Sequence, residues 1–235
     1  MSDERNKLVQ SIFIPSLLVI LLWIIKGTEL IFSMDLGFLG IYPLQPKGLP
    51  GILLSPLIHN DVKHLAANTL PLLVLGTSII YFYREIAYRV LLLLYIIPGI
   101  WVWFGGREAY HIGASGVIYA MAAFLFFSGL IRRDGKLMAL SLLVVFLYGS
   151  MVWGIFPNFM PEKNISWESH LMGLLAGLVV AIYYRARGPQ RKKYEWELEE
   201  EEENSHDDDD DDDHDHDQDG ENDSTGYEIR YTYKE

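Results

Sequence analysis

Long apolar segments alternate with short polar ones over most of the chain. Six apolar blocks occupy residues 11–32, 64–83, 88–106, 113–131, 137–156 and 169–186. Each is close to the length of about 20 residues that crosses a bilayer as a helix. Because lipid offers no hydrogen-bond partner to an open backbone, each block is predicted to be helical. The first block is too long to be a removable signal peptide, and it lacks the pattern of a cleavage site. The pattern predicts an all-α polytopic membrane protein with six transmembrane helices.

The same pattern divides the chain into three regions: an N-terminal arm (1–10), a six-helix domain (11–187) and an acidic C-terminal tail (188–235). Residues 195–235 carry 21 acidic and 2 basic side chains. Such a segment cannot bury enough apolar surface to fold, so the tail is predicted to be disordered. Its three histidines among aspartates are compatible with weak divalent-ion binding, although a solvated tail is the favoured interpretation; they are His206, His214 and His216.

Charge along the chain predicts the orientation of the helices. The net charge of the whole chain is −12, yet the first 194 residues carry 17 basic and 10 acidic side chains. Twelve of these basic residues lie on the side that holds both termini, and five lie on the other side. Cytoplasmic connections are enriched in Lys and Arg, so both termini are expected in the cytoplasm. The protein itself is expected in the inner membrane of a prokaryotic cell. The absence of cysteine excludes disulfide and thiol chemistry.

Polar residues stand at the predicted external starts of spans two, four and six. His64 and Asn68 are four residues apart on one helix face, Ser115 opens the fourth span, and His170 opens the sixth. Taken alone, a histidine at the start of a span is more often an interfacial or capping residue than a catalyst. Likewise, "GASG" taken alone is more often a packing site than a nucleophile motif. Polar groups within spans are costly and tend to face a bundle interior or a wet cavity. Four of them at one depth therefore favour a single pocket.

The chemistry of these residues fits a serine hydrolase. A serine hydroxyl is a weak nucleophile until a base takes its proton, and His170 is placed to do so for Ser115. The backbone N–H of Ser115 at a helix start, with the side chains of His64 and Asn68, can donate to an oxyanion. Glu168 lies two residues before His170 and is expected on a different face. The sequence thus favours a Ser–His dyad over a triad.

At these residues the chain resembles the rhomboid intramembrane serine proteases, over about residues 11–185. "HNDVKHLAAN" resembles the family's histidine-rich second span, "GASG" its G-x-S-G motif, and "SHLMGLLAG" its H-x-x-G-x-x-x-G motif. The resemblance implies a protease without cofactor or metal, which cuts single-pass or multi-pass membrane proteins in a lipid bilayer and binds no nucleic acid. It leaves the oligomeric state open. It also implies the role of nucleophile for Ser115, of base for His170, and matching positions for His59, His64, Asn68 and Tyr119.

Glycines accompany the proposed dyad. Gly113 and Gly116 flank Ser115, while Gly173 and Gly177 share the helix face of His170. Small residues of this kind let membrane helices approach closely, so the fourth and sixth spans are predicted to pack tightly. Two features are less regular. The connection after span one lacks the Trp-Arg pair of many rhomboids. Glu29 is an acid near the outer end of span one, and a functional, a snorkelling and a loop-bonding role are all compatible with it.

Two other functions are compatible with parts of the pattern. A non-catalytic rhomboid-like protein that binds or escorts membrane proteins is expected to lack the serine or the histidine, and this chain has both. A transporter would place charged or helix-breaking residues near mid-bilayer in paired halves, and only Pro98 comes close. An intramembrane serine endopeptidase is therefore the favoured interpretation. Small residues in span five, Gly149, Ser150 and Gly154, mark that span as the expected entry gate for substrates.

Overall fold

The structure is a computed structural model that describes residues 2–133 and 166–189, together with residues 135, 137, 139, 140, 143 and 146. Most of the predicted fifth span, its proposed gate residues and nearly all of the tail lie outside these residues. The helices are α1 (Ser2–Phe32), α2 (Gly51–Leu54), α3 (Val62–Phe82), α4 (Ala87–Gly105), α5 (Ser115–Arg132) and α7 (Trp167–Tyr183). The described part contains no β-strand, only one isolated bridge between Ile41 and His111. The predicted all-α fold is confirmed.

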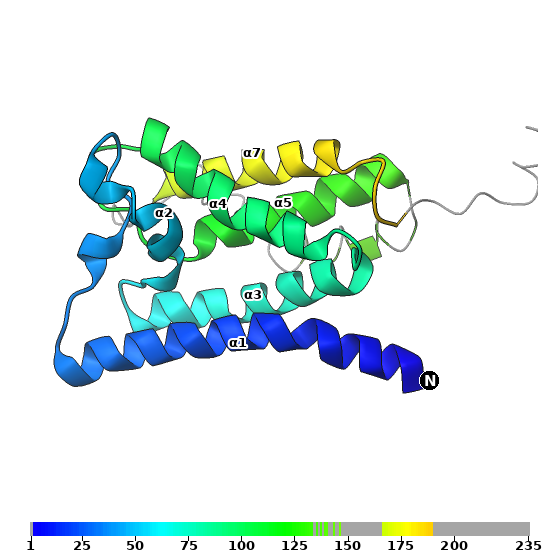
Figure 1. The fold of residues 1–235 in the computed structure, drawn as a ribbon, viewed down its shortest axis with the longest axis horizontal. Helices are drawn as coiled ribbons and strands as arrows, with labels where there is room; N and C mark the ends of the chain where they lie inside the picture. Colours follow the sequence, from blue (N-terminus) through cyan, green and yellow to red (C-terminus); the bar gives the residue numbers. More distant parts are fainter. Residues whose placement is uncertain are drawn as a thin grey trace, which may run out of the picture. The chain divides into compact units, whose positions relative to one another are not determined.

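Four helices, α1, α3, α4 and α5, are long and apolar enough to cross a membrane. α7 is also apolar but has 17 residues, the lower limit of about 17–25 for a spanning helix. These helices lie roughly along one direction, with α1 beside α3 and α5 beside α7 (Figure 1). Many outward side chains of α1 are large and apolar, as expected where lipid is the solvent; among them are Leu17, Ile20, Leu21, Ile24, Leu30 and Ile31.

α1 is longer than the predicted span, since it begins at Ser2 and continues through the residues predicted to form an N-terminal arm. Lys7 pairs with Asp3 and Glu4 at helical spacing, with N–O distances of 3.1 and 3.0 Å. Ion pairs at this spacing stabilise a helix. The prediction missed these first turns because it rested on apolar residues alone. At 31 residues α1 is about 46 Å long, so its polar first turns extend beyond a hydrocarbon layer of about 30 Å.

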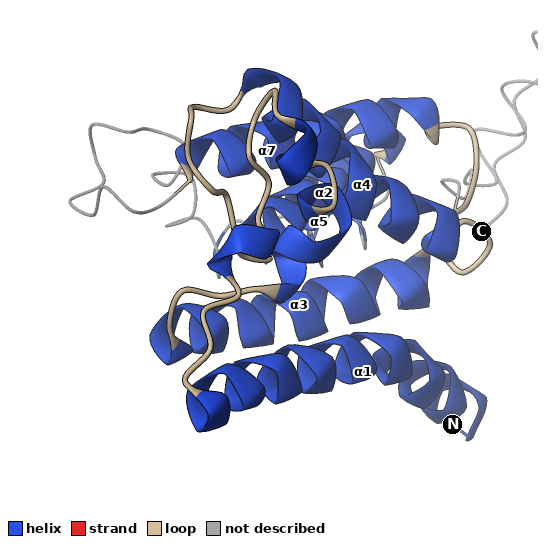
Figure 2. Cartoon of the chain, turned by 60° about the vertical axis from the view of Figure 1, so that its left-hand side comes forward, coloured by secondary structure: helices blue, strands red, loops and turns tan. Residues whose placement is uncertain are grey.

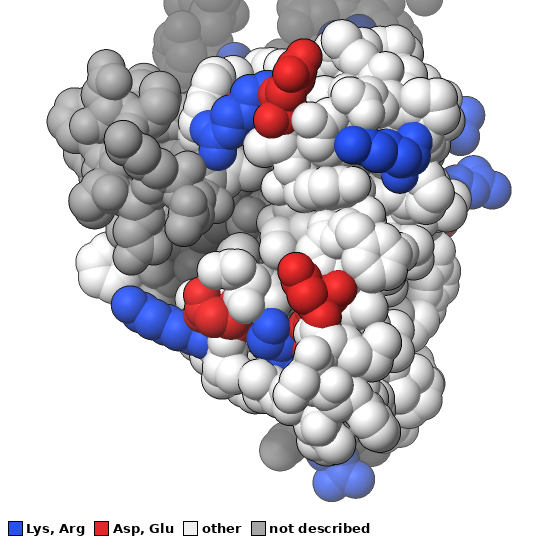
Figure 3. Space-filling view, turned by 90° about the vertical axis from the view of Figure 1, so that its left-hand side faces the viewer, with Lys and Arg blue, Asp and Glu red and all other residues white. Residues whose placement is uncertain are grey.

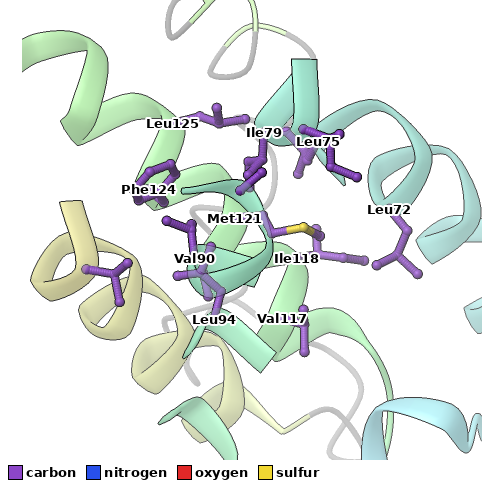
Figure 4. Close-up of a cluster of buried hydrophobic side chains, with 14 of the residues drawn as sticks. Leu72, Leu75, Ile79, Val90, Leu94, Val117, Ile118, Met121, Phe124 and Leu125 are labelled. Atoms are coloured by element: carbon purple, nitrogen blue, oxygen red, sulfur yellow. The ribbon is translucent and has the colours of Figure 1, made fainter. Parts of the chain in front are cut away.

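The core lies among α3, α4 and α5. Figure 4 shows side chains from these helices pointing toward one another, including Ile79 of α3, Val90 and Leu94 of α4, and Ile118 and Phe124 of α5. All five have relative exposures of 0%. α5 contacts α3, α4 and α7, and 12 of its 18 residues are buried, a larger share than in α3, α4 or α7. Ser115 therefore starts the most buried of these helices.

The connection between α1 and α3 forms an irregular cap at one end of the helices (Figure 2). It contains three 3₁₀ turns, Gly37–Leu39, Pro46–Gly48 and Ser55–Leu57, besides α2. Its backbone packs tightly on itself, since a Cβ at Gly48 would overlap Tyr42 and one at Gly51 would overlap Gly40. Figure 3 views this end of the molecule, where charged side chains of both signs are scattered over a mostly uncharged surface.

Candidate active site

Ser115 and His170 meet at the adjacent starts of α5 and α7. Ser115 is the first residue of α5, and His170 lies in the first turn of α7. The Ser115 Oγ lies 2.9 Å from the His170 Nε2, within ordinary hydrogen-bonding distance. His170 is 5% exposed, whereas Ser115 is partly accessible. The two residues that the sequence paired across 55 positions are therefore in direct contact.

Tyr119 holds the imidazole of His170 from one side. Its ring stacks on the histidine ring with centroids 4.2 Å apart and an interplanar angle of 7°. Tyr119 is one turn after Ser115 on α5, so one helix presents both the hydroxyl and the flat surface that orients the imidazole. Tyr119 itself is 7% exposed, which restricts its movement.

Glycines set the distance between α5 and α7. A Cβ at Gly173 would overlap the carbonyl oxygen of Gly116, and a Cβ at Gly177 would overlap that of Ala120. A Cβ at Gly116 would in turn lie 3.1 Å from the Ser169 carbonyl oxygen. The two backbones are thus in contact along the face that carries His170, which brings its ring within reach of Ser115.

The start of α3 brings His59, His64 and Asn68 together. Asp61 caps α3, because its carboxylate accepts a hydrogen bond of 2.8 Å from the His64 backbone N–H. The amide of Asn68 donates to His59 Nε2 at 3.0 Å, and the rings of His59 and His64 meet edge to face at 5.2 Å. The Ala114 N–H also points to His59 Nε2, at 3.5 Å. Two donors aimed at Nε2 require the proton of a neutral ring to be on Nδ1.

Burial keeps this histidine neutral. His59 is 2% exposed, and desolvation lowers its pKa to about 4, assisted by the nearby His64 and Lys26. The neutral ring accepts one hydrogen of the Asn68 amide. The second amide hydrogen remains for another acceptor.

The segment before Ser115 passes close to His64. Gly113 has φ of +108°, a region that favours glycine, and a Cβ there would lie 2.8 Å from His64 Cε1. The Gly113 N–H donates to the Ser55 carbonyl at 2.9 Å, which ties this segment to the α1–α3 connection. The site residues named from the sequence therefore lie around the starts of α3, α5 and α7, except Gly177, which packs against Ala120 and Phe124 further along α5.

The sequence did not anticipate the partner of Glu29. The carboxylate of Glu29 accepts from Lys26 Nζ at 3.1 Å and from the Leu36 backbone N–H at 3.1 Å. Lys26 also donates to the carbonyls of His59 (2.9 Å) and Asn60 (3.1 Å). Both side chains are buried, with residue exposures of 8% and 5%. Glu29 thus binds the connection between α1 and α3. Its i,i+3 spacing from Lys26 is the sequence signal that could have identified this ion pair.

This geometry defines a class of site: a hydroxyl beside an imidazole, with amide donors nearby, at one end of a bundle of apolar helices. Among the described residues no group of three metal-ligating side chains occurs. Such a site can activate a serine for attack on a carbonyl.

Comparison with known proteins places the chain in a family. The rhomboid domain model matches residues 47–187, which include both Ser115 and His170. The chain is 35% identical over 180 residues to uncharacterized proteins of Mycobacterium bovis and Mycobacterium tuberculosis, covering 74% of this chain and 74% of each relative. An uncharacterized protein of Mycobacterium leprae is 33% identical over 178 residues, covering 73% of this chain and 70% of that protein. The chain belongs to the rhomboid family and is an integral, multi-pass membrane protein.

Proposed function

We propose that the protein is an intramembrane serine endopeptidase that hydrolyses peptide bonds in or near the transmembrane segments of other membrane proteins. The observation that carries this proposal is the 2.9 Å contact between Ser115 Oγ and His170 Nε2. In the proposed reaction Ser115 attacks the scissile carbonyl while His170 takes its proton. His170 then gives the proton to the leaving amine, and water hydrolyses the acyl-enzyme in a second step of the same kind.

The negative oxygen of the tetrahedral intermediate needs donors. The N–H of Ser115 is at the N-terminus of α5 and has no partner within that helix. Asn68 has a free amide hydrogen once His59 has accepted the other, and His64 lies next to Gly113. These groups form the proposed oxyanion site. His59 is assigned a supporting role, because it orients the Asn68 amide.

The site lies at the end of the helices that charge assigns to the external side. A substrate helix hides its carbonyls in its own hydrogen bonds, so it has to unwind near its outer end before Ser115 can attack. Small residues at the cut, followed by Gly or Pro, are therefore the expected features of substrates. No observation on the described residues favours the escort function.

Cleavage of a transmembrane substrate, with enzyme and substrate purified and reconstituted in liposomes, tests this proposal. Ser115→Ala and His170→Ala are expected to abolish cleavage while the protein still inserts and unfolds at a similar temperature. The matched control is Ser33→Ala, an exposed serine after α1. Turnover by Ser115→Ala equal to that of the unaltered protein would exclude the proposed function.

A further inference from the structure

A second pair of side chains joins the same two segments that carry the dyad. His111 Nδ1 lies 2.6 Å from Ser166 Oγ. His111 is four residues before Ser115, and Ser166 is four residues before His170. The two contacts therefore span the same 55 positions.

The direction of this hydrogen bond follows from its neighbours. His111 Nε2 lies 3.0 Å from the Arg107 carbonyl oxygen, which can only accept, so Nε2 carries the ring proton. His111 is 2% exposed, and burial lowers the pKa of its imidazole, which favours the neutral form. Nδ1 is then a bare acceptor, and the Ser166 hydroxyl donates its one proton to it, at 2.6 Å rather than to Glu168 Oε2 at 3.4 Å. The Ser169 hydroxyl, 2.8 Å away, therefore donates to Ser166 Oγ.

Ser166 also determines where α7 begins. Its Oγ accepts a hydrogen bond of 3.2 Å from the Ser169 N–H, which makes it the N-cap of α7. Next to this cap, the carboxylate of the buried Glu168 lies 3.5 Å from Nη1 of the Arg107 guanidinium. The backbone carbonyl of Arg107 is the group that accepts from His111. The first turn of α7 is thus bound to the α4–α5 connection through both His111 and Arg107.

His111 is itself held in place. Its backbone exchanges two hydrogen bonds with Ile41, of 3.0 and 2.9 Å, in the only β-bridge of the described residues. From His111 the chain reaches Ser115 through Gly113, which is bound to Ser55. The imidazole therefore links the segment that delivers Ser115 to the turn that delivers His170.

We propose that His111 and Ser166 are positioning residues, whose hydrogen bond holds the first turn of α7 in the register that places His170 against Ser115. Neither side chain touches the reacting atoms. The inference rests on the proposed protease function. It predicts that loss of this bond slows the chemical step more than it weakens substrate binding, because misplacing a catalytic group by about 1 Å can cost 10²-fold in rate.

The test compares His111→Phe, Ser166→Ala and the double variant in the reconstituted cleavage assay. Each single variant is expected to lower kcat by about 10- to 100-fold while KM stays within about twofold. The double variant is expected to be less impaired than the product of the two single effects, because both changes remove the shared bond. Each change also removes a bond of its own: the α7 cap in Ser166→Ala and the bond to the Arg107 carbonyl in His111→Phe. Ser166→Thr keeps the hydroxyl and is expected to retain the rate. Glu108→Gln, an exposed acid in the same connection, is the matched control.

Labelling of Ser115 by a fluorophosphonate supplies a second readout that needs no substrate docking, and its rate should fall in parallel with kcat. An unchanged kcat in His111→Phe, with only a lower unfolding temperature, would show a merely structural role and overturn the inference. If His111→Phe does not fold, equal rates for Ser166→Ala and Ser166→Thr would overturn it. If the unaltered protein shows no Ser115-dependent cleavage, the proposed function fails first and this inference with it.

Discussion

At the scale of single residues, Asn68 tests the proposed oxyanion site. Its amide is bound on one side by His59, which leaves one N–H for the developing negative charge. Asn68→Ala is expected to lower kcat in the reconstituted assay by about 10²–10³-fold, the usual loss when one such donor is removed. Asn60→Ala is the matched control, since that exposed side chain bonds only Asp61. Full activity in Asn68→Ala would show that Asn68 is not a donor of the oxyanion site.

His59 gives a prediction about pH. Its pKa in the folded protein is about 4, against an ordinary value of about 6.5. Between these values the unfolded chain binds a proton that the folded protein does not, so the free energy of unfolding is expected to fall as pH drops from about 6.5 to about 4. Above about pH 6.5 this group contributes no pH dependence.

The measurement is the thermal unfolding midpoint in detergent at several pH values, for the unaltered protein and for His59→Gln. The glutamine keeps an acceptor for Asn68 but does not titrate. The decrease toward low pH should be smaller in the variant. Parallel curves would contradict the assignment of a buried, neutral His59.

At the scale of the helices, the contact of α5 with α7 depends on Gly173. A methyl group there would overlap the Gly116 carbonyl oxygen, so Gly173→Ala has to push the helices apart. Overpacking of this kind costs about 1–3 kcal/mol, and the displaced His170 should also slow cleavage. Gly27→Ala in α1 is the control, because nothing lies within 4 Å of the added Cβ. Equal unfolding midpoints for the two variants would contradict this account of the interface.

Lys26 and Glu29 join α1 to the α1–α3 connection. Removing one partner leaves a buried charge without its counterpart, a loss of about 3–5 kcal/mol where burial is complete. Lys26→Met is therefore expected to lower the unfolding midpoint strongly, and the double variant with Glu29→Gln to recover part of the loss. Lys63→Met, at an exposed lysine next to this connection, is the control. A Lys26→Met variant as stable as Lys63→Met would show that the pair contributes little.

At the scale of the whole molecule, the sequence predicted the helical class because lipid forces long apolar segments into helices. It also named Ser115, His170 and Tyr119, which the structure brings into contact, although their catalytic roles stay predictions. The path of the α1–α3 connection was not predictable, because its turns depend on backbone contacts such as those of Gly48 and Gly51. Nor was the bond between His111 and Ser166, since neither residue belongs to a motif that indicates the other, whereas Ser115 and His170 do.

The central claim is that His170 activates Ser115, and covalent labelling by a fluorophosphonate tests it most directly. The folded protein in detergent should be labelled at Ser115, as located by peptide mass mapping. His170→Ala should slow that labelling by orders of magnitude, while the control Ser33→Ala reacts like the unaltered protein. Labelling of Ser115 at the same rate with and without His170, or no labelling at all, would contradict the account.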